Sequence, residues 1–177
     1  MEMPPRTPHM RSRTRLRRII SGGQSGVDRA ALDAAIDCGL QVGGWCPRGR
    51  KAEDGPLPLR YPLKETPSPH PAQRTAWNVR EADGTLIFSP SPLSGGTALT
   101  LKIASRLQKP CLLISLEHPL SPQRVCSWID GHGIATLNVA GPRESSCPGI
   151  YQHAYHFLRR VFQRIQSLSS PIPYETC

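Results

Sequence analysis

The sequence lacks any uninterrupted apolar stretch long enough to cross a membrane, and its first residues lack the apolar segment of a secretion signal. Its 6 cysteines include no Cys-x-x-Cys pair, so the sequence predicts neither a disulfide-rich framework nor a zinc ribbon. Its 6 histidines show no spacing typical of metal ligands. We therefore expect a cytoplasmic protein with reduced thiols, no membrane contact and no metal site.

Acidic residues are scarce: 13 Asp and Glu stand against 22 Lys and Arg, which gives a net charge of +9. Much of this excess lies near the N-terminus, where arginines and prolines are frequent and apolar side chains are few. We expect residues 1–16 to form a disordered basic arm, either simply solvated or in contact with nucleic acid or an acidic surface. Nucleic acid is the less favoured partner, because no aromatic side chains alternate with these arginines. Residues 17–168 then form one domain, followed by a flexible tail over 169–177.

Short apolar strands alternate with amphipathic helices along this domain. The strands are expected near 19–20, 40–42, 85–88, 111–114 and 134–139. The helices are expected over 27–36, 71–81, 96–107, 122–132 and 150–168, with Trp77 of the second helix facing inward. Residues 43–60 are rich in glycine and proline, which predicts a long loop. The alternation predicts a parallel sheet covered by helices on both faces.

The segment 21–28 (S-G-G-Q-S-G-V-D) connects the first strand to the first helix. Its glycines, Gly22, Gly23 and Gly26, allow a tight turn and the close approach of a ligand to backbone amides. The helix that follows has unpaired N–H groups and a partial positive charge at its start, which suits a phosphate. The spacing matches neither a dinucleotide-binding motif nor a nucleoside triphosphate loop. The segment is therefore either a phosphate cradle or a tight turn without a ligand.

Two further loops at strand ends share this chemistry. S-G-G-T (94–97) starts the third helix, and A-G-P-R-E-S (140–145) follows the last strand. Because the carboxyl ends of parallel strands meet at one edge of a sheet, we expect the three loops to lie together. Arg143 could hold an anion by two parallel bonds. The loops also offer the hydroxyl groups of Ser25, Ser94 and Thr97. Together these groups indicate a phosphorylated, nucleotide-sized ligand.

Other polar side chains are open to two interpretations each. Asp28 lies in the first turn of its helix, where it either complements the helix dipole or bonds a ribose, base or pterin edge. Glu53 and Asp54 lie on the long loop, either as an exposed charge cluster or as ligands to Mg²⁺ or to ring N–H groups. Arg74 and Asn78 are four residues apart on one helix face, either at the surface or in contact with the ligand.

Five sequence blocks occur here in one order, namely I-S-G-G-Q-S-G-V-D-R-A-A-L-D-A-A, G-G-W-C-P-R-G-R-K-A-E-D-G, R-T-A-W-N-V-R-E-A-D-G-T-L-I, S-G-G-T-A-L-T and L-N-V-A-G-P-R-E-S-S-C-P-G-I-Y. Over about residues 17 to 165 the chain thereby resembles the bacterial putative molybdenum carrier family. This family is a circularly permuted branch of the SLOG-type Rossmann-like superfamily, related to the lonely-guy phosphoribohydrolases. The resemblance implies an α/β, Rossmann-like three-layer sandwich with a mostly parallel sheet. It also implies binding of a molybdenum cofactor (molybdopterin), whose pterin carries a phosphate.

The resemblance also implies ligand contacts by position. They are Gly22, Gly23, Gln24, Gly26 and Asp28 in the first block, Ser94, Gly95, Gly96 and Thr97 in the second glycine turn, and Arg143, Glu144 and Ser145 in the last block. Ser25, Arg74 and Asn78 complete the candidate site, in which no residue is assigned a catalytic role. The phosphoribohydrolases keep a catalytic glutamate three residues after the threonine of their second glycine motif, where this chain has Thr100. Hydrolysis by their mechanism is therefore not expected.

Two classes of function follow from the sequence. The first is a carrier that holds a phosphorylated pterin or nucleotide-like ligand unchanged. It is favoured because the donor-rich loops come without an assignable acid–base pair. The second is a nucleotide-processing enzyme, similar to a nucleoside monophosphate hydrolase, and a nucleotide sensor is a further alternative. Relatives of this fold class often pair, so a homo-oligomer also remains open.

Overall fold

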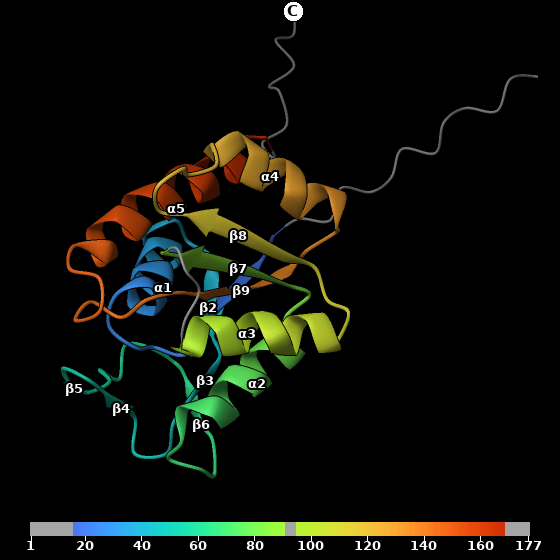
Figure 1. Ribbon diagram of the computed structural model, residues 1–177. Coiled ribbons are helices and arrows are strands. Elements are labelled where there is room, and N and C mark those ends of the chain that lie inside the picture. The colour runs from blue at the N-terminus through green and yellow to red at the C-terminus, as the bar shows by residue number, and fades with distance from the viewer. Residues whose placement is uncertain (1–15, 91–94, 169–177) are drawn as a thin grey trace, which may run out of the picture.

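The computed structural model describes residues 16–90 and 95–168, and its centre is a five-stranded sheet (Figure 1). The strands lie in the order β2 (Gln41–Gly43), β1 (Arg18–Ile20), β9 (Thr136–Ala140), β7 (Gly84–Ser89) and β8 (Cys111–Ser115). Each strand runs parallel to its neighbour. The carboxyl ends of all five therefore meet at one edge of the sheet.

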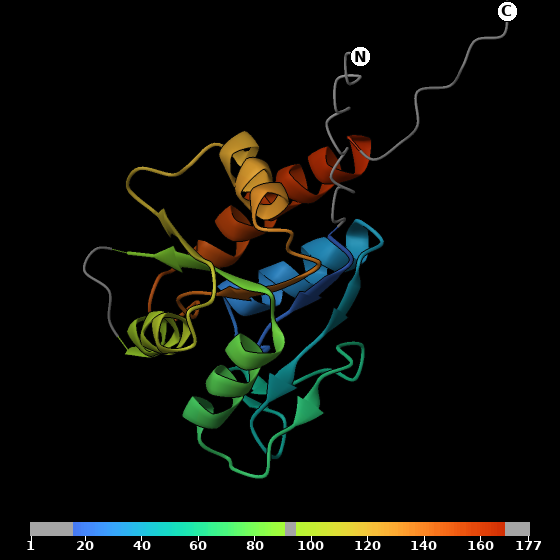
Figure 2. The same ribbon diagram turned by 90° about the vertical axis from the view of Figure 1, so that its right-hand side faces the viewer.

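Helices cover both faces of the sheet (Figure 2). One face carries α1 (Val27–Asp37), α4 (Pro122–Gly131) and α5 (Ile150–Ser167), and the other carries α2 (Pro71–Glu81) and α3 (Gly95–Arg106). This arrangement confirms the expected Rossmann-like three-layer sandwich, and each helix end lies within one residue of its predicted position. None of the helices within the described ranges combines the length and apolar character needed to span a bilayer.

The main core lies between the sheet and the layer of α1, α4 and α5. Side chains that alternate along the strands point into it, and Ile19, Phe88 and Val139 are all 0% exposed there. Leu16, expected to belong to the basic arm, is 1% exposed in the same core. The folded domain therefore includes at least one residue more than predicted. α1 contributes small side chains that allow close packing against α5, namely Ala30, Ala31, Ala34 and Ala35.

Residues 44–66, which follow β2 and include most of the connection to α2, are named here the crossover segment. The sequence predicted a loop over most of it, whereas the structure contains four two-residue strands (Figure 1). β3 (Trp45–Cys46) pairs in parallel with β6 (Lys64–Glu65), and β4 (Lys51–Ala52) pairs antiparallel with β5 (Gly55–Pro56). Strands this short leave many carbonyl groups without a ladder partner.

Arg50 supplies partners for these carbonyls. Its side chain donates four hydrogen bonds, with donor–acceptor distances between 2.9 and 3.2 Å, to the carbonyl oxygens of Leu57, Pro58, Tyr61 and Leu63. The backbone φ of Arg50 is 50°, in the left-handed region, so the residue also turns the chain. One guanidinium group thus holds much of the crossover segment together.

Trp77 differs from its expected place. It is only half-buried and packs edge-on against Trp45 of the crossover segment, with 4.6 Å between ring centroids. The guanidinium carbon of Arg80 lies 5.4 Å from the Trp77 ring on its own helix. The prediction that Trp77 faces inward was wrong, because one side of α2 packs against the crossover segment and Trp77 lies on that side.

Candidate anion-binding site

The loops that follow β1 and β9 pack directly against each other. Gly26 has a φ of +77°, and a Cβ there would lie 2.5 Å from the carbonyl oxygen of Pro142 and 2.8 Å from the amide nitrogen of Glu144. The N–H group of Val27 donates to the same Pro142 carbonyl at 3.1 Å. Only glycine fits both this conformation and this contact. Two of the three loops singled out in the sequence therefore meet.

A cavity of about 270 Å³ lies between these loops and the start of α3. The first N–H groups of α3 have no partner within the helix and carry its partial positive charge. The cavity brings together six residues of the candidate site, which are Gln24, Arg74, Gly95, Gly96, Thr97 and Arg143. A helix start and two arginines thus border one small space.

Asp28 holds Arg74 at the wall of this cavity. Asp28 is 2% exposed, and its Oδ2 lies 3.1 Å from Nη1 of Arg74. The amide of Gln24 donates to the same oxygen at 3.3 Å. Burial raises the pKa of Asp28, and the charge of Arg74 opposes that rise. Asp28 does not line the cavity itself, but it holds Arg74 and Gln24, which do.

Arg143 is the more accessible of the two cavity arginines. Its side chain is 55% exposed, compared with 16% for Arg74. Its Nη1 lies 3.8 Å from Oε2 of Glu53, near the outer limit of an ion pair. Such a weakly paired guanidinium can turn toward an anion at small energetic cost.

Glu53 of the crossover segment joins the loops after β1 and β9. It accepts hydrogen bonds from the hydroxyl of Ser25, from the hydroxyl of Ser145 and, at 3.1 Å, from the amide of Ser145. The bonds from Ser145 and Ser25 lower the pKa of Glu53. Gln24 adds to the junction, because its Oε1 accepts from the amides of Ser25 and Glu53 at 3.0 and 2.9 Å. Glu53 therefore links three segments, a role that the sequence did not indicate.

Asp54 forms a second link between the crossover segment and α1. Both of its carboxylate oxygens accept from the guanidinium of Arg29, at 2.5 and 3.0 Å, which lowers the pKa of Asp54. Arg29 also donates to the carbonyl oxygen of Gly23 at 3.2 Å. Across residues 16–90 and 95–168, no group of three or more His, Cys, Asp or Glu side chains is placed to hold a metal ion.

Asn78 and Glu144 have partners within the protein. The side chain of Asn78 accepts from the amide of Trp45 at 2.8 Å and donates to its carbonyl oxygen at 3.0 Å. The carboxylate of Glu144 accepts from the amides of Gly149 and Tyr151, the second at 2.9 Å. The bonds of Asn78 tie α2 to β3, and those of Glu144 satisfy free N–H groups at the start of α5.

The remaining glycines of the first loop, Gly22 and Gly23, are not among the residues that line the cavity. Gly22 lies against the guanidinium of Arg74, and Gly23 packs against the side chains of Leu57 and Leu63. Ser94 lies outside the described residues.

Three prolines that the sequence did not single out also line the cavity. Pro71 begins α2, Pro90 follows β7, and Pro142 immediately precedes Arg143. Prolines are common at such element ends, so their positions alone carry no functional signal. They place apolar residues beside the polar groups of the cavity lining.

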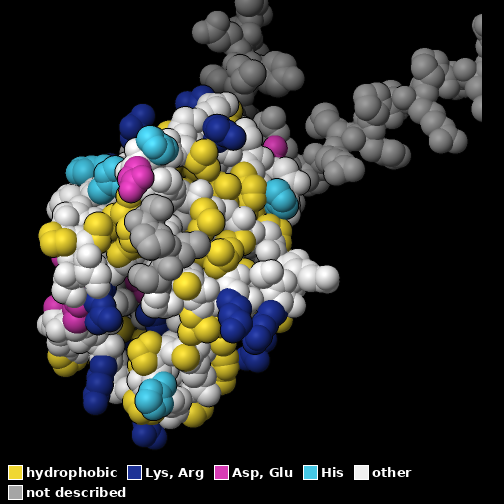
Figure 3. Space-filling model, viewed as in Figure 1, with side chains coloured by type: hydrophobic (Ala, Val, Ile, Leu, Met, Phe, Trp, Pro, Cys, Tyr) yellow, Lys and Arg dark blue, Asp and Glu magenta, His cyan; other side chains and the backbone are white. Residues whose placement is uncertain are grey.

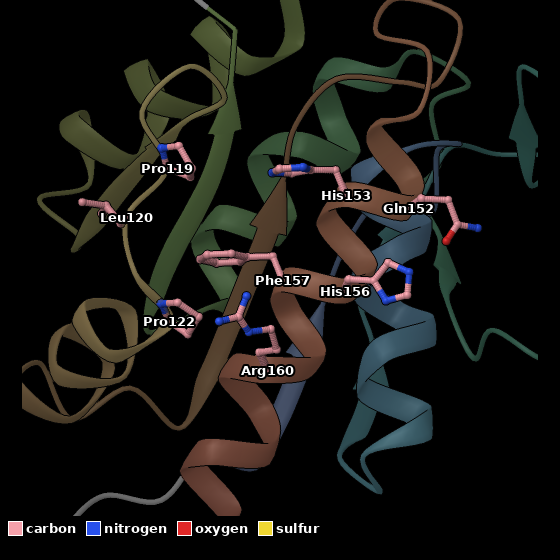
Figure 4. Close-up of a pocket in the computed structure, with 8 residues that line it drawn as sticks. All are labelled: Pro119, Leu120, Pro122, Gln152, His153, His156, Phe157 and Arg160. Carbon is pink, nitrogen blue, oxygen red and sulfur yellow. The ribbon is translucent and has the colours of Figure 1, made fainter.

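A second cavity, of about 520 Å³, lies between α5 and the segment before α4. Figure 4 shows His153, Phe157 and Arg160 pointing toward the segment Pro119–Pro122, while His156 points away from it. No glycine lines this cavity, which is bordered by two histidines and an arginine, whereas three glycines line the cavity at the loops. Its chemistry therefore differs from that of the cavity at the loops.

Comparisons with known proteins agree with this architecture. No curated protein matches the chain. A solved structure described as a "putative molybdenum carrier protein", from Syntrophus aciditrophicus SB, shares 45% sequence identity and a TM-score of 0.79. The similarity covers 86% of this chain and 98% of that one. Residues 19–162 match the model of the circularly permutated YpsA SLOG family, so the chain belongs to that family.

Proposed function

We propose that this chain is a carrier that binds a phosphorylated small molecule, of pterin or nucleotide type, in the cavity between the loops. The observation that carries the proposal is the meeting of the α3 start with Arg74 and Arg143 around one cavity. Helix starts and guanidinium groups are both well suited to bind phosphate. The carrier role follows the name of the solved relative.

The two arginines suit different tasks in binding. Arg74 is fixed by Asp28, so it offers a positive charge in a set place without a cost in side-chain ordering. Arg143 is exposed and weakly paired, so it can close over a bound phosphate. If Arg143 leaves Glu53 for a phosphate, the Glu53 carboxylate still accepts hydrogen bonds from the hydroxyls of Ser25 and Ser145.

The size of the cavity limits the ligand. A volume of about 270 Å³ lies just below the usual range for drug-sized ligands, so it suits one phosphate and one ring system better than a dinucleotide. Proline walls offer a surface for a flat ring, and the groups on the polar side donate hydrogen bonds. Hydrogen-bond donors bind the oxygens of an anion and not a bare metal ion. We therefore propose that molybdenum is carried as part of an anionic ligand.

A nucleotide-processing activity is the alternative outcome. Among the acidic groups of the site, Asp28 is the best candidate for a general acid. Burial raises its pKa, and its carboxylate contacts Arg74 at the cavity. Thr100, at the position where the phosphoribohydrolases have glutamate, donates its hydroxyl to the Gly96 carbonyl at 2.7 Å within α3. This contact favours binding without turnover.

Isothermal titration calorimetry with inorganic phosphate, AMP, GMP and a phosphorylated pterin tests the proposal. We expect saturable binding of a phosphorylated ring compound, weakened at least tenfold by Arg143→Ala, which corresponds to about 1.4 kcal/mol. Arg124→Ala, at an exposed position on α4, is the matched control and should bind normally. Chromatography of the recovered ligand should show it unchanged, and metal analysis of the purified protein tests for molybdenum. Equal binding by both variants would place the ligand elsewhere, and turnover lost in Asp28→Ala would favour the enzyme.

A further inference from the structure

Gln24 lines the cavity at the loops, and three of its four polar atoms have partners within the protein. Its amide donates to Oδ2 of Asp28 at 3.3 Å, and its backbone carbonyl accepts from the Arg29 amide at 3.1 Å. Its Oε1 accepts from the amides of Ser25 and Glu53 at 3.0 and 2.9 Å. Its Nε2 has no acceptor among the described residues and is not buried. This nitrogen is therefore the group that Gln24 can offer to a ligand.

The two bonds to Oε1 fix the direction in which the side-chain amide of Gln24 faces. Backbone N–H groups only donate, so the atom that receives both of them must be the oxygen. A half-turn of the amide would set its nitrogen against the N–H groups of Ser25 and Glu53, and both bonds would be lost. A free glutamine can present either its oxygen or its nitrogen to a ligand. Gln24 can present only its nitrogen, so it is a fixed hydrogen-bond donor.

The charged groups and the helix start at the cavity are donors as well. Arg74 and Arg143 have no acceptor atom in their side chains, and the first N–H groups of α3 have no partner within the helix. Figure 3 shows Lys and Arg side chains on the surface beside the start of α3, whose place Figure 1 gives. No Asp or Glu is among the described residues that line the cavity. The cavity therefore selects a ligand by the acceptor atoms that the ligand carries.

These donors suit different parts of a phosphorylated ring compound. A guanidinium group or a helix start carries positive charge and binds an anion more strongly than a neutral amide does. The phosphate therefore goes to the arginines and the α3 start, which leaves the neutral donor of Gln24 for the ring. A carbonyl oxygen on the ring would accept from Nε2, whereas an amino group in the same place would bring two donors together.

We propose that Gln24 determines the specificity of the site, and that it selects a ring with a carbonyl oxygen over the same ring with an amino group in its place. This inference rests on the proposed function, because it concerns the ring of the same phosphorylated ligand. Pterins and the purines guanine and hypoxanthine share such a carbonyl group. Adenine has an amino group at the corresponding position.

The fixed direction of Gln24 makes this selection strong. Its side chain is already ordered, so binding of the right ring costs little further ordering. The wrong ring leaves Nε2 without an acceptor in a confined space, and Gln24 cannot turn to relieve the mismatch without losing both bonds to Oε1. Sites that hydrogen-bond one ligand group reject analogues that lack it far more strongly than apolar pockets do.

Isothermal titration calorimetry with two matched pairs of compounds tests the preference. One pair is IMP and AMP, and the other is a phosphorylated pterin and its analogue with an amino group in place of the ring carbonyl. Within the pair that binds more tightly, we expect the carbonyl compound to bind at least about tenfold better. The identity of that pair distinguishes a purine from a pterin ligand.

The outcomes separate this inference from the proposed function. Equal affinities within the tighter pair, or preference for the amino compound, would overturn the selection by Gln24 while the phosphate site stands. Absence of binding by all four compounds would overturn the proposed function, and the inference would fall with it. This comparison uses the wild-type chain alone, so it does not depend on the folding of a variant.

Gln24→Glu tests the residue itself. One carboxylate oxygen can still accept from the amides of Ser25 and Glu53, while the other puts an acceptor in place of Nε2. The added negative charge weakens both members of a pair alike, so the ratio of their dissociation constants is the readout. We expect the tenfold preference to fall to about one or to reverse.

Gln123→Glu is the matched control for this charge, because Gln123 is exposed on α4 and lies away from the cavity. It should keep the wild-type ratio, and circular dichroism checks that both variants fold. A wild-type ratio retained in Gln24→Glu would show that another group reads the ring, and it would overturn the role given to Gln24.

Discussion

Gly22 and Arg74 are in direct contact, because a Cβ at residue 22 would lie 2.0 Å from Nη1 of Arg74. The glycine therefore leaves room for the guanidinium that Asp28 holds at the cavity wall. This contact explains why the first loop needs a glycine at a position where the backbone has no unusual conformation.

Gly22→Ala should displace Arg74 and lower the free energy of unfolding by about 1–3 kcal/mol, since the added methyl group has no space. Urea denaturation measures the change. Gly131→Ala is the control, because nothing lies within 4 Å of a Cβ there, and it should change stability by less than about 1 kcal/mol. Equal effects of the two substitutions would show that Arg74 has another place to go.

Arg50→Met should loosen the crossover segment while the sheet stays intact. The substitution leaves four carbonyl groups without their donor, at a cost of about 3 kcal/mol. Hydrogen exchange should show lost protection within residues 44–66 and little change in β7 or β9. Arg48→Met, at an exposed neighbouring position, should leave the exchange pattern as it is. Unchanged protection in Arg50→Met would contradict the role given to this side chain.

Glu53→Gln should make the protein less stable at neutral pH, by about 1 kcal/mol, because a neutral amide accepts weaker hydrogen bonds than a carboxylate. The pKa of Glu53 is lower in the folded protein than in the unfolded chain. The ionised carboxylate therefore stabilises the fold at pH values above its unfolded-state pKa, and this stabilisation is lost as pH falls through its folded-state pKa. The difference between wild type and variant should therefore disappear in acid. Asp130→Asn, at an exposed carboxylate of α4, should show no such difference.

Asp28→Asn should show the opposite dependence on pH. The pKa of Asp28 is raised in the folded state, so the folded protein binds this proton more tightly than the unfolded chain does. The free energy of unfolding of the wild type minus that of the variant should be highest at low pH. It should decline as pH rises from the unfolded-state pKa of Asp28 through its folded-state pKa. Unfolding by urea at several pH values gives the slope, and a flat or rising difference would show that Arg74 outweighs burial.

The sequence predicted the parts of this fold that depend on local pattern. Glycine turns, buried β-branched runs and amphipathic helices are properties of neighbouring residues, so α2 and β7 could be placed closely. The parallel sheet then predicted that the loops near Gly26 and Arg143 would lie together, because strand ends share one edge.

The contacts of the crossover segment could not be predicted in this way. Glu53 reaches Ser145, which is 92 residues away, and Arg50 bonds carbonyls in a stretch without long strands. Such contacts depend on how an irregular segment folds back onto the domain, and the pattern of apolar and polar residues does not predict that path. The prediction for Trp77 failed for the same reason, since its partner Trp45 belongs to this segment.

The crossover segment contributes no strand to the central sheet, yet through Glu53 it braces the rim of the cavity. Insertions or deletions between Arg50 and Leu63 could therefore reshape the binding space while the scaffold stays the same. Among relatives, differences in the shape of this cavity should accordingly follow the length and composition of this stretch more closely than those of the strands.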